Sequence, residues 1–106
     1  MSIDSERLEE YILSHTTSES PYRQRLWREA HVRLLRARML SGHLQGNLIQ
    51  MLCRISGAQK VLELGTFTGY AAHCLAEALG EGGEVHTIES DDEMEDFIHE
   101  FLDGTP

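Results

Sequence analysis

The chain has 106 residues, a length that suits one domain or part of one, and 41% of its residues are hydrophobic, as in ordinary globular proteins. Its formal net charge of −9 disfavours nucleic acid as a partner, because phosphate binding needs clustered positive charge. No apolar run approaches the roughly 20 residues that cross a bilayer, and the N-terminus lacks the pattern of a signal peptide, so the sequence predicts a cytoplasmic protein without a membrane partner.

Charge divides the chain into two unequal parts. All nine Lys and Arg lie at or before Lys60, where six acidic residues leave a balance of +3. From Val61 onward twelve acidic residues stand without a single Lys or Arg. Such a segment repels itself, so we expect it to lie beside a basic surface, either the N-terminal helices or a C-terminal half beyond Pro106.

The N-terminal part predicts helices. In residues 4–13 the spacing of Leu8, Tyr11 and Ile12 predicts a short amphipathic helix, which a polar break over residues 15–21 ends. Residues 22–39 predict a longer, arginine-rich helix with the inward residues Leu26, Trp27, Ala30, Leu34 and Leu35. Residues 44–55 predict a third helix with the apolar residues Leu48, Ile49, Leu52 and Ile55.

The remainder alternates strand and helix. The near-continuous apolar run at 60–64 predicts a central parallel strand covered on both faces, and residues 68–79 predict the helix that follows it. A second strand is expected over 84–89, and a final helix, capped at Ser90 and Asp91, ends near Leu102. This order predicts an α/β fold, N-terminal helices followed by β-α-β-α with parallel strands. Cys53 and Cys74 fall on apolar helix faces and are expected to be buried free thiols.

A glycine turn follows the first strand. Gly65 lets the backbone bend and approach a ligand closely, and Gly69 allows the same at the start of a helix whose free N–H groups suit a carboxylate or phosphate. Glu89 stands 24 residues after Gly65, at the carboxyl end of the neighbouring strand, where a ribose would lie. The alternative is that the glycines only close a turn and the carboxylate is a solvated cap. The matching spacing favours a cofactor site.

The glycine spacing separates two cofactor classes. A dinucleotide fold has the pattern G-x-G-x-x-G, whereas here Phe67 occupies the place where the middle glycine meets a pyrophosphate. Nucleotide ligands without a pyrophosphate fit better, and S-adenosyl-L-methionine is the common one. A dehydrogenase of the NAD type is disfavoured by the missing glycine but stays open as an alternative.

Residues 61–72, which read VLELGTFTGYAA, resemble the first motif of class I methyltransferases. Within that class they resemble the catechol and caffeoyl-CoA O-methyltransferase group, whose version is L-E-[LI]-G-x-[YF]-[TC]-G-Y-S. Residues 39–46, MLSGHLQG, resemble the M-x-x-G-x-x-x-G segment of that group, which lies against the methionine end of the cofactor. Residues 87–89 resemble its ribose-binding strand end. The likeness extends over roughly residues 36–97 and implies the N-terminal part of a Rossmann-like methyltransferase fold.

The resemblance implies a set of residues that bind S-adenosyl-L-methionine. Glu63 and Gly65 would line the pocket, Glu89 would hold the ribose and Ser90 would lie beside the adenine. The full set is Met39, Leu40, Ser41, Glu63, Gly65, Thr66, Phe67, Gly69, Tyr70, Glu89 and Ser90.

Two departures from the family pattern have consequences. The family usually has Ser where this chain has Ala71, and losing a hydrogen bond to a charged group costs about 1.5–3 kcal/mol of cofactor binding. The Asp and Asn residues that hold a divalent metal in the family, and the Lys that assists deprotonation, follow later strands with no counterpart in these residues. The catalytic residues are therefore unknown, magnesium is expected only in a full-length protein, and the 106-residue chain is expected to be inactive.

Other polar groups are weaker candidates. Glu95 and His99 are four residues apart on the last predicted helix, but one His and one acid do not make a metal site. His43 is expected to be a polar loop residue, and His73 and Cys74 are expected to pack in the interior. The arginine-rich helix is interpreted as solvated or facing another subunit.

Three hypotheses follow from these observations. The first is the N-terminal part of an S-adenosyl-L-methionine-dependent O-methyltransferase, with a small, catechol-like acceptor, a helical cap over residues 1–57, half of the cofactor domain over 58–106, and a homodimer as the assembly. The second is a non-catalytic, self-associating α/β module with residual cofactor binding. The third is the dehydrogenase fragment.

Overall fold

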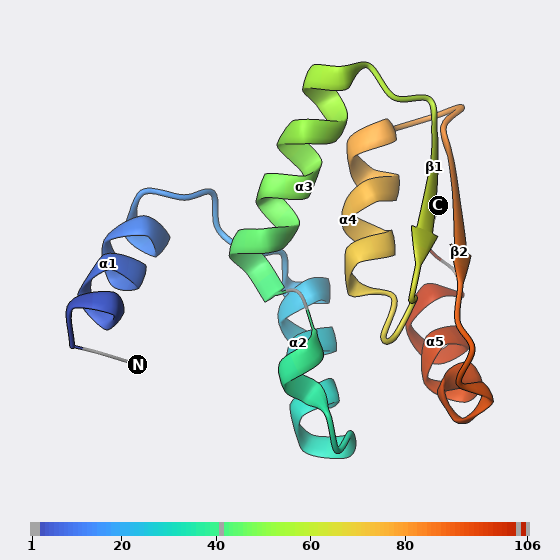
Figure 1. Cartoon of the computed structure of the whole chain (residues 1–106), viewed down its shortest axis with the longest axis horizontal. Helices are drawn as coiled ribbons and strands as arrows, with labels where there is room; N and C mark the ends of the chain where they lie inside the picture. The colour runs from blue at the N-terminus through green and yellow to red at the C-terminus, as the bar shows by residue number, and fades with distance from the viewer. Residues whose placement is uncertain (1–2, 41, 104, 106) are drawn as a thin grey trace.

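The computed structural model describes residues 3–40, 42–103 and 105 (Figure 1). Helices and strands occur in the predicted order, with two 3₁₀ turns, η1 and η2. The elements are α1 (Ile3–Ser14), α2 (Pro21–Arg33), η1 (Ala37–Met39), α3 (Gly42–Ser56), β1 (Lys60–Leu64), α4 (Tyr70–Leu79), β2 (Glu84–Ile88), η2 (Asp92–Met94) and α5 (Glu95–Leu102). Among the described residues, no helix is both long enough and apolar enough to cross a membrane.

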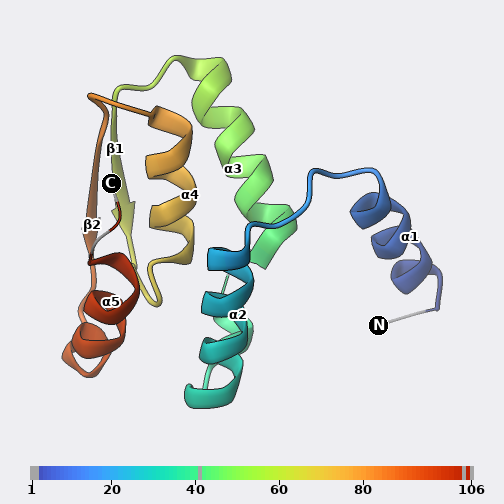
Figure 2. The same ribbon diagram turned by 180° about the vertical axis from the view of Figure 1, so that it is seen from behind.

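The two strands form a parallel sheet, as predicted. Their register runs from Lys60 opposite Glu84 to Leu64 opposite Ile88. Helix α4 lies on one face of this sheet and α3 lies on the far side of α4, so the molecule has three layers in this region (Figures 1 and 2). The prediction that β1 is covered on both faces is wrong for the described residues. Leu62, Leu64 and Ile88 are exposed on the second face, because the only helix layer packed on the sheet lies on the first.

The core lies between α2, α4 and the C-terminal helix rather than inside the sheet. Apolar side chains at spacings of four residues place one buried face on each helix. The buried cluster consists of Leu26, Ala30, Tyr70, Cys74, Met94, Phe97 and Phe101. The Tyr22 hydroxyl donates a hydrogen bond to the carbonyl oxygen of Phe101, which ties the second helix to the last one. Helix α2 and the β-α-β-α segment therefore share one core.

Arginines of α2 face the acidic segment. Arg33 Nη2 lies 2.8 Å from Glu100 Oε2, and the Arg25 guanidinium lies 5.1 Å from the centre of the Phe101 ring. The nearly buried Arg23 donates from Nη1 to Glu77 Oε2 at 2.8 Å. The expectation that the acidic segment lies beside the basic N-terminal helices is met at these contacts.

Helix α2 ends earlier than the sequence predicts. Leu34 has extended backbone angles, φ −114° and ψ 143°, and packs against the core from outside the helix. A helix over 22–39 is therefore wrong beyond Arg33. Trp27 and Leu35, both expected to face inward, are exposed. The helical phase is lost at Leu34, and Trp27 stacks on His31 along the outer side of α2.

The face through which helix α3 packs is not formed by its largest apolar side chains. Leu48, Leu52 and Ile55 are exposed, whereas Gly46, Gln50 and Cys53 are buried against α4. A Cβ atom on Gly46 would lie 2.8 Å from the Cys74 sulfur, so only glycine permits this close approach. The Gln50 amide donates to the Cys74 carbonyl oxygen at 2.9 Å. The close approach of the two helix backbones at Gly46 therefore decides which face of α3 is buried. Both cysteines are free and buried, as predicted.

Candidate functional site

The carboxyl ends of the two strands are joined by hydrogen bonds from the glycine turn. The N–H groups of Gly65 and Thr66 both donate to the Ile88 carbonyl oxygen, at 2.7 and 3.2 Å. Glu89 follows directly: its Oε1 accepts from the Phe67 N–H at 2.6 Å and its Oε2 accepts from the Asp91 N–H at 3.1 Å. Two segments that are more than 20 residues apart thus form one rim at the carboxyl end of the sheet, where open α/β folds bind ligands.

The turn uses its two glycines for different purposes. Gly65 has φ +97°, and a Cβ atom placed on it would meet no atom within 4 Å. Gly69 has φ +85°, but there a Cβ atom would lie 2.9 Å from Leu102 of α5. Between them Phe67 adopts φ +48°, a left-handed conformation that is rare for a bulky residue and concentrates at functional sites. Gly65 therefore presents bare backbone to open space, and Gly69 lets the turn pack on the last helix.

Most of the predicted site residues line one small cavity. Its volume is about 50 Å³, well below the roughly 300 Å³ at which ligand pockets begin, so the described residues form part of a pocket wall. The lining residues are Met39, Leu40, Glu63, Gly65, Thr66, Phe67, Thr68, Tyr70 and Ala71. Thr68 also lines the cavity but was not among the predicted site residues. Its side chain is fully buried, and in the sequence only its place in the motif could have indicated a role.

The remaining predicted residues lie elsewhere. Gly69 is buried behind the turn, and Ser90 is exposed at the rim. Glu89 lines a neighbouring cavity of about 290 Å³, which also contains Thr66 and Thr87. Ser41 falls outside the described residues. Most residues that line the small cavity were therefore among those predicted, whereas the strand-end carboxylate lines the neighbouring cavity.

The two carboxylates of the site are perturbed in opposite directions. Burial raises the pKa of Glu63 above its usual value, and the nearby negative charge of Glu89 raises it further. The Thr87 hydroxyl, which donates to Glu63 Oε1 at 2.7 Å, lowers it in part. The pKa of Glu89 is lowered, first by the Phe67 N–H and then by the Asp91 N–H. Glu63 is thus a half-buried carboxylate that no positively charged side chain of the described residues compensates, and Glu89 is held ionised by the turn.

Tyr70 connects the site to the segment before α2. Its hydroxyl donates to the Glu19 carboxylate, and burial followed by this bond raises the Tyr70 pKa. The same segment is held by His43, whose Nε2 lies 2.7 Å from the Thr17 carbonyl oxygen. His43 does not line the cavity, and the prediction that it is a loop residue is wrong, because it lies in the first turn of α3. A contact across 51 residues gives no signal in the sequence, so the part played by Glu19 could not be foreseen.

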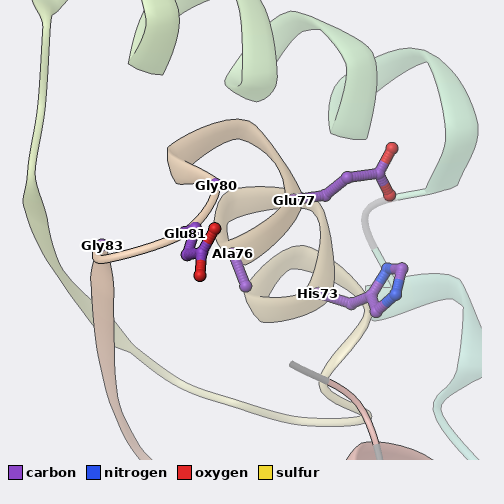
Figure 3. Close-up of a pocket in the computed structure, with 6 residues that line it drawn as sticks. All are labelled: His73, Ala76, Glu77, Gly80, Glu81 and Gly83. Atoms are coloured by element: carbon purple, nitrogen blue, oxygen red, sulfur yellow. The ribbon is translucent and has the colours of Figure 1, made fainter.

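A larger cavity of about 630 Å³ lies at the other end of α4, lined by His73, Ala76, Glu77, Gly80, Glu81 and Gly83 (Figure 3). Two of its side chains make contacts within the fold. Glu77 pairs with Arg23, and His73 stacks on Tyr22 with ring centres 4.4 Å apart. Burial, together with Arg23, lowers the His73 pKa. Because this cavity lies away from the carboxyl ends of the strands, volume alone does not make it the candidate site.

Metal ligands are not gathered at either place. In the part of the chain that the structure describes, no three His, Cys, Asp or Glu side chains come close enough to hold a metal ion. His99 Nδ1 lies 3.1 Å from Asp103 Oδ1, and this contact raises the His99 pKa. The glycine turn, with Glu89 beside it, lies at the carboxyl end of the sheet and is the candidate site.

Comparison with known proteins agrees with this assignment. A family model described as O-methyltransferase matches residues 13–106. The chain belongs to this O-methyltransferase family. Similar family members include the mouse catechol O-methyltransferase domain-containing protein 1, 53% identical over 49 residues, which are 46% of this chain and 19% of the mouse protein. The caffeoyl-CoA O-methyltransferase of Populus kitakamiensis is 40% identical over 47 residues, 44% of this chain and 20% of that protein. The predicted resemblance to the catechol and caffeoyl-CoA group is confirmed.

Solved structures confirm the fold of this chain. The chain matches the methyltransferase PaMTH1 of Podospora anserina, solved with SAH (S-adenosylhomocysteine), with a TM-score of 0.86 and 22% identity over 93% of the chain. It matches the O-methyltransferase TomG of Streptomyces achromogenes, solved with SAM (S-adenosylmethionine), with a TM-score of 0.81 and 26% identity over 96% of the chain. It spans 43% and 46% of those two structures, and about a fifth of the curated relatives above.

Proposed function

We propose that this chain carries the cofactor-binding rim of an S-adenosyl-L-methionine-dependent O-methyltransferase, which methylates a hydroxyl of a small, catechol-like acceptor. The observation that carries the proposal is the joining of the two strand ends, where the Glu89 carboxylate accepts the Phe67 N–H beside the bare backbone of Gly65. Family membership, the names of the relatives and the cofactor-bound structural neighbours support it.

The residues present fit such a cofactor. A positively charged ligand would offset the desolvation that raises the Glu63 pKa. Glu89 has two further acceptor positions for ribose hydroxyls, because a carboxylate accepts about four hydrogen bonds and two are used. The first-turn N–H groups of α4 suit the carboxylate of the methionine end. When bound, the cofactor supplies an electrophilic methyl group.

The remaining roles are proposals of the same kind. Met39 and Leu40 would contact the methionine end, Phe67 and Tyr70 would shape the pocket, and Ser90 would lie beside the adenine. Residues 1–57 would act as a cap over the half cofactor domain of residues 58–106. A divalent metal such as magnesium is proposed for a full-length protein only. We expect the 106 residues alone not to transfer methyl groups, because a cavity of about 50 Å³ cannot enclose both donor and acceptor. The cytoplasmic location stays a prediction.

Calorimetric titration tests the proposal directly. S-adenosylhomocysteine is titrated into the purified chain, with NAD as the matched nucleotide control. Binding of S-adenosylhomocysteine with weaker or absent binding of NAD is expected, because Phe67 stands where a pyrophosphate needs a glycine. Tighter binding of NAD would overturn the assignment and revive the dehydrogenase hypothesis. Absence of S-adenosylhomocysteine binding would refute the statement that these residues form a cofactor rim by themselves.

A further inference from the structure

A short segment of the connection between α1 and α2, residues 17–20, bridges two sides of the small cavity, and we call it the strap. The Thr17 carbonyl oxygen accepts a hydrogen bond at 2.7 Å from Nε2 of His43, in the first turn of α3 (Figure 2). The Glu19 carboxylate accepts one from the hydroxyl of Tyr70, the first residue of α4. Because η1, which precedes α3, and the start of α4 both line the cavity, the strap contacts the elements on its two sides.

Glu19 is held in place by the start of α2. Its carbonyl oxygen accepts a hydrogen bond from Gln24 Nε2 at 2.8 Å. The next residue, Ser20, caps α2 by accepting the Arg23 N–H on its Oγ at 3.2 Å, and Pro21 fixes the backbone at the first helical position. Helix α2 is itself packed in the shared core. The position of the Glu19 backbone is therefore set by the core of the molecule.

Tyr70 is fixed at its backbone, its ring and its hydroxyl. Its N–H donates to Thr68 Oγ1 at 3.3 Å, within the glycine turn. Its ring lies against α3, where a Cβ atom on Gly46 would be 3.2 Å from Tyr70 Cε1. The side chain is 1% exposed, so its hydroxyl is buried and depends on Glu19 as an acceptor. Without that acceptor, the hydroxyl can regain a partner only if the ring turns toward the cavity that it lines.

We infer that Glu19 is a positioning residue of the cofactor rim. Its carboxylate holds Tyr70, and through Tyr70 the start of α4, in the orientation that leaves the cavity open. Glu19 is not one of the residues that line the cavity, so it acts through Tyr70 and not by touching a ligand. The inference rests on the proposed function, because it assigns the cavity to the methionine end of the cofactor.

Calorimetry with S-adenosylhomocysteine on the full chain is the first test. Glu19→Ala should weaken binding at least about tenfold, because a buried hydroxyl loses its partner beside the ligand. Glu19→Gln keeps an oxygen acceptor in the same place and should stay within about threefold of the wild-type affinity. If Glu19→Gln weakens binding as much as Glu19→Ala, the hydrogen bond to Tyr70 is not what matters and the inference is wrong.

Tyr22→Phe is the matched control. It also deletes a tyrosine hydroxyl that bonds across the core, to the Phe101 carbonyl oxygen, but Tyr22 lies outside the cavity wall. It should leave binding of S-adenosylhomocysteine unchanged. Circular dichroism verifies that each variant folds. A loss of affinity in Tyr22→Phe equal to that in Glu19→Ala would show that any weakening of the core impairs binding, and would overturn the positioning role.

A double-mutant cycle tests whether Glu19 acts through Tyr70. Tyr70→Phe removes the donor of the same hydrogen bond and keeps the ring, so it should weaken binding about as much as Glu19→Ala. The double variant should bind no more weakly than either single variant, because both changes delete one interaction. Losses that multiply in the double variant would mean that the two residues act independently and would refute the inference. Tyr70→Phe also carries the test if Glu19→Ala does not fold.

Hydrogen exchange followed by NMR gives a readout that needs no cofactor. The N–H groups of Gly69 and Tyr70 donate hydrogen bonds within the glycine turn. Both should exchange at least about fivefold faster in Glu19→Ala than in the wild-type chain, and at the wild-type rate in Tyr22→Phe. Equal acceleration in both variants would indicate a general loss of stability and would contradict the inference.

The two measurements separate this inference from the proposed function. If the wild-type chain does not bind S-adenosylhomocysteine, the proposed function fails, and hydrogen exchange still decides whether Glu19 holds the start of α4. If the wild-type chain binds, and neither affinity nor exchange responds to Glu19→Ala, the proposed function stands and the positioning role is wrong.

Discussion

Replacement of Gly65 by alanine separates the conformational role of this residue from its role in the site. At φ +97° an L-residue is strained, and a side chain in the left-handed region costs about 1–2 kcal/mol. The new Cβ atom meets nothing within 4 Å, so no steric clash adds to this cost. Alanine also restricts the unfolded chain, which returns about 0.4–1 kcal/mol. We expect a net loss of about 1 kcal/mol, or a Tm lower by roughly 4–8 °C for a domain of this size.

Cofactor binding should respond more strongly than stability. The Cβ atom of Gly65→Ala enters the open space that the proposed function assigns to the cofactor. We expect binding of S-adenosylhomocysteine to weaken at least about tenfold, which corresponds to ~1.4 kcal/mol. Urea or thermal unfolding measures the first effect, and calorimetry below the melting transition measures the second.

Gly82 provides a matched control. It has φ +87°, a Cβ atom there would also meet nothing within 4 Å, and it lies in the turn between α4 and β2, away from the glycine turn. Gly82→Ala should therefore cost the same stability and leave binding unchanged. If Gly65→Ala costs no stability, the argument from backbone strain is wrong. If both variants weaken binding equally, the site has been placed at the wrong glycine.

Four further predictions follow from single contacts. Burial raises the pKa of Glu63, so the fold favours its protonated form. The contribution of this residue to stability is present below the ordinary pKa of 4.5 and is lost as the pH rises through the raised pKa. Glu63→Gln should therefore flatten the pH dependence of urea unfolding and should not destabilise the chain at neutral pH. Ala71→Ser should tighten binding of S-adenosylhomocysteine by about 10–100-fold if its hydroxyl reaches the cofactor carboxylate, and an unchanged calorimetric affinity would contradict that role. Glu77→Gln leaves the Arg23 guanidinium, 5% exposed, with a neutral partner, so a loss of about 1–3 kcal/mol is expected in urea unfolding; a loss below about 0.5 kcal/mol would mean that solvent screens the pair. Burial raises the pKa of Cys74 to about 11, so this thiol should react slowly with iodoacetamide at about pH 8 until the chain unfolds, and rapid native labelling identified by mass spectrometry would refute its burial.

Local sequence predicted the structure correctly where the backbone requirements and the hydrophobic periodicity indicate the same element. The apolar run at Lys60–Leu64 was predicted with its true bounds, and the next strand was predicted one residue too long. The glycine turn between them was recognisable because φ values near +90° restrict Gly65 and Gly69 to glycine. The family assignment rests on the same residues, since a short rigid turn needs the same residue types at the same spacing.

Local sequence was insufficient where two faces of one helix compete. Leu52 and Ile55 have the spacing of an apolar helix face, but α3 packs through Gly46 and Gln50. An apolar stripe indicates that another element covers it but does not identify that element. The end of α2 at Arg33 also depends on tertiary packing, because Leu34 contacts the core from extended backbone outside the helix.

By itself, the sequence determined the order of elements, the parallel pairing and the glycine turn, because each depends on residues close together in the chain. The tertiary structure alone decided which carboxylate is buried and which is held ionised, how Glu19 meets Tyr70, and which side of α3 stays open. These features depend on distances between segments 20 to 50 residues apart. Packing sets those distances through close approaches such as that of Gly46 to Cys74, and no local pattern contains them.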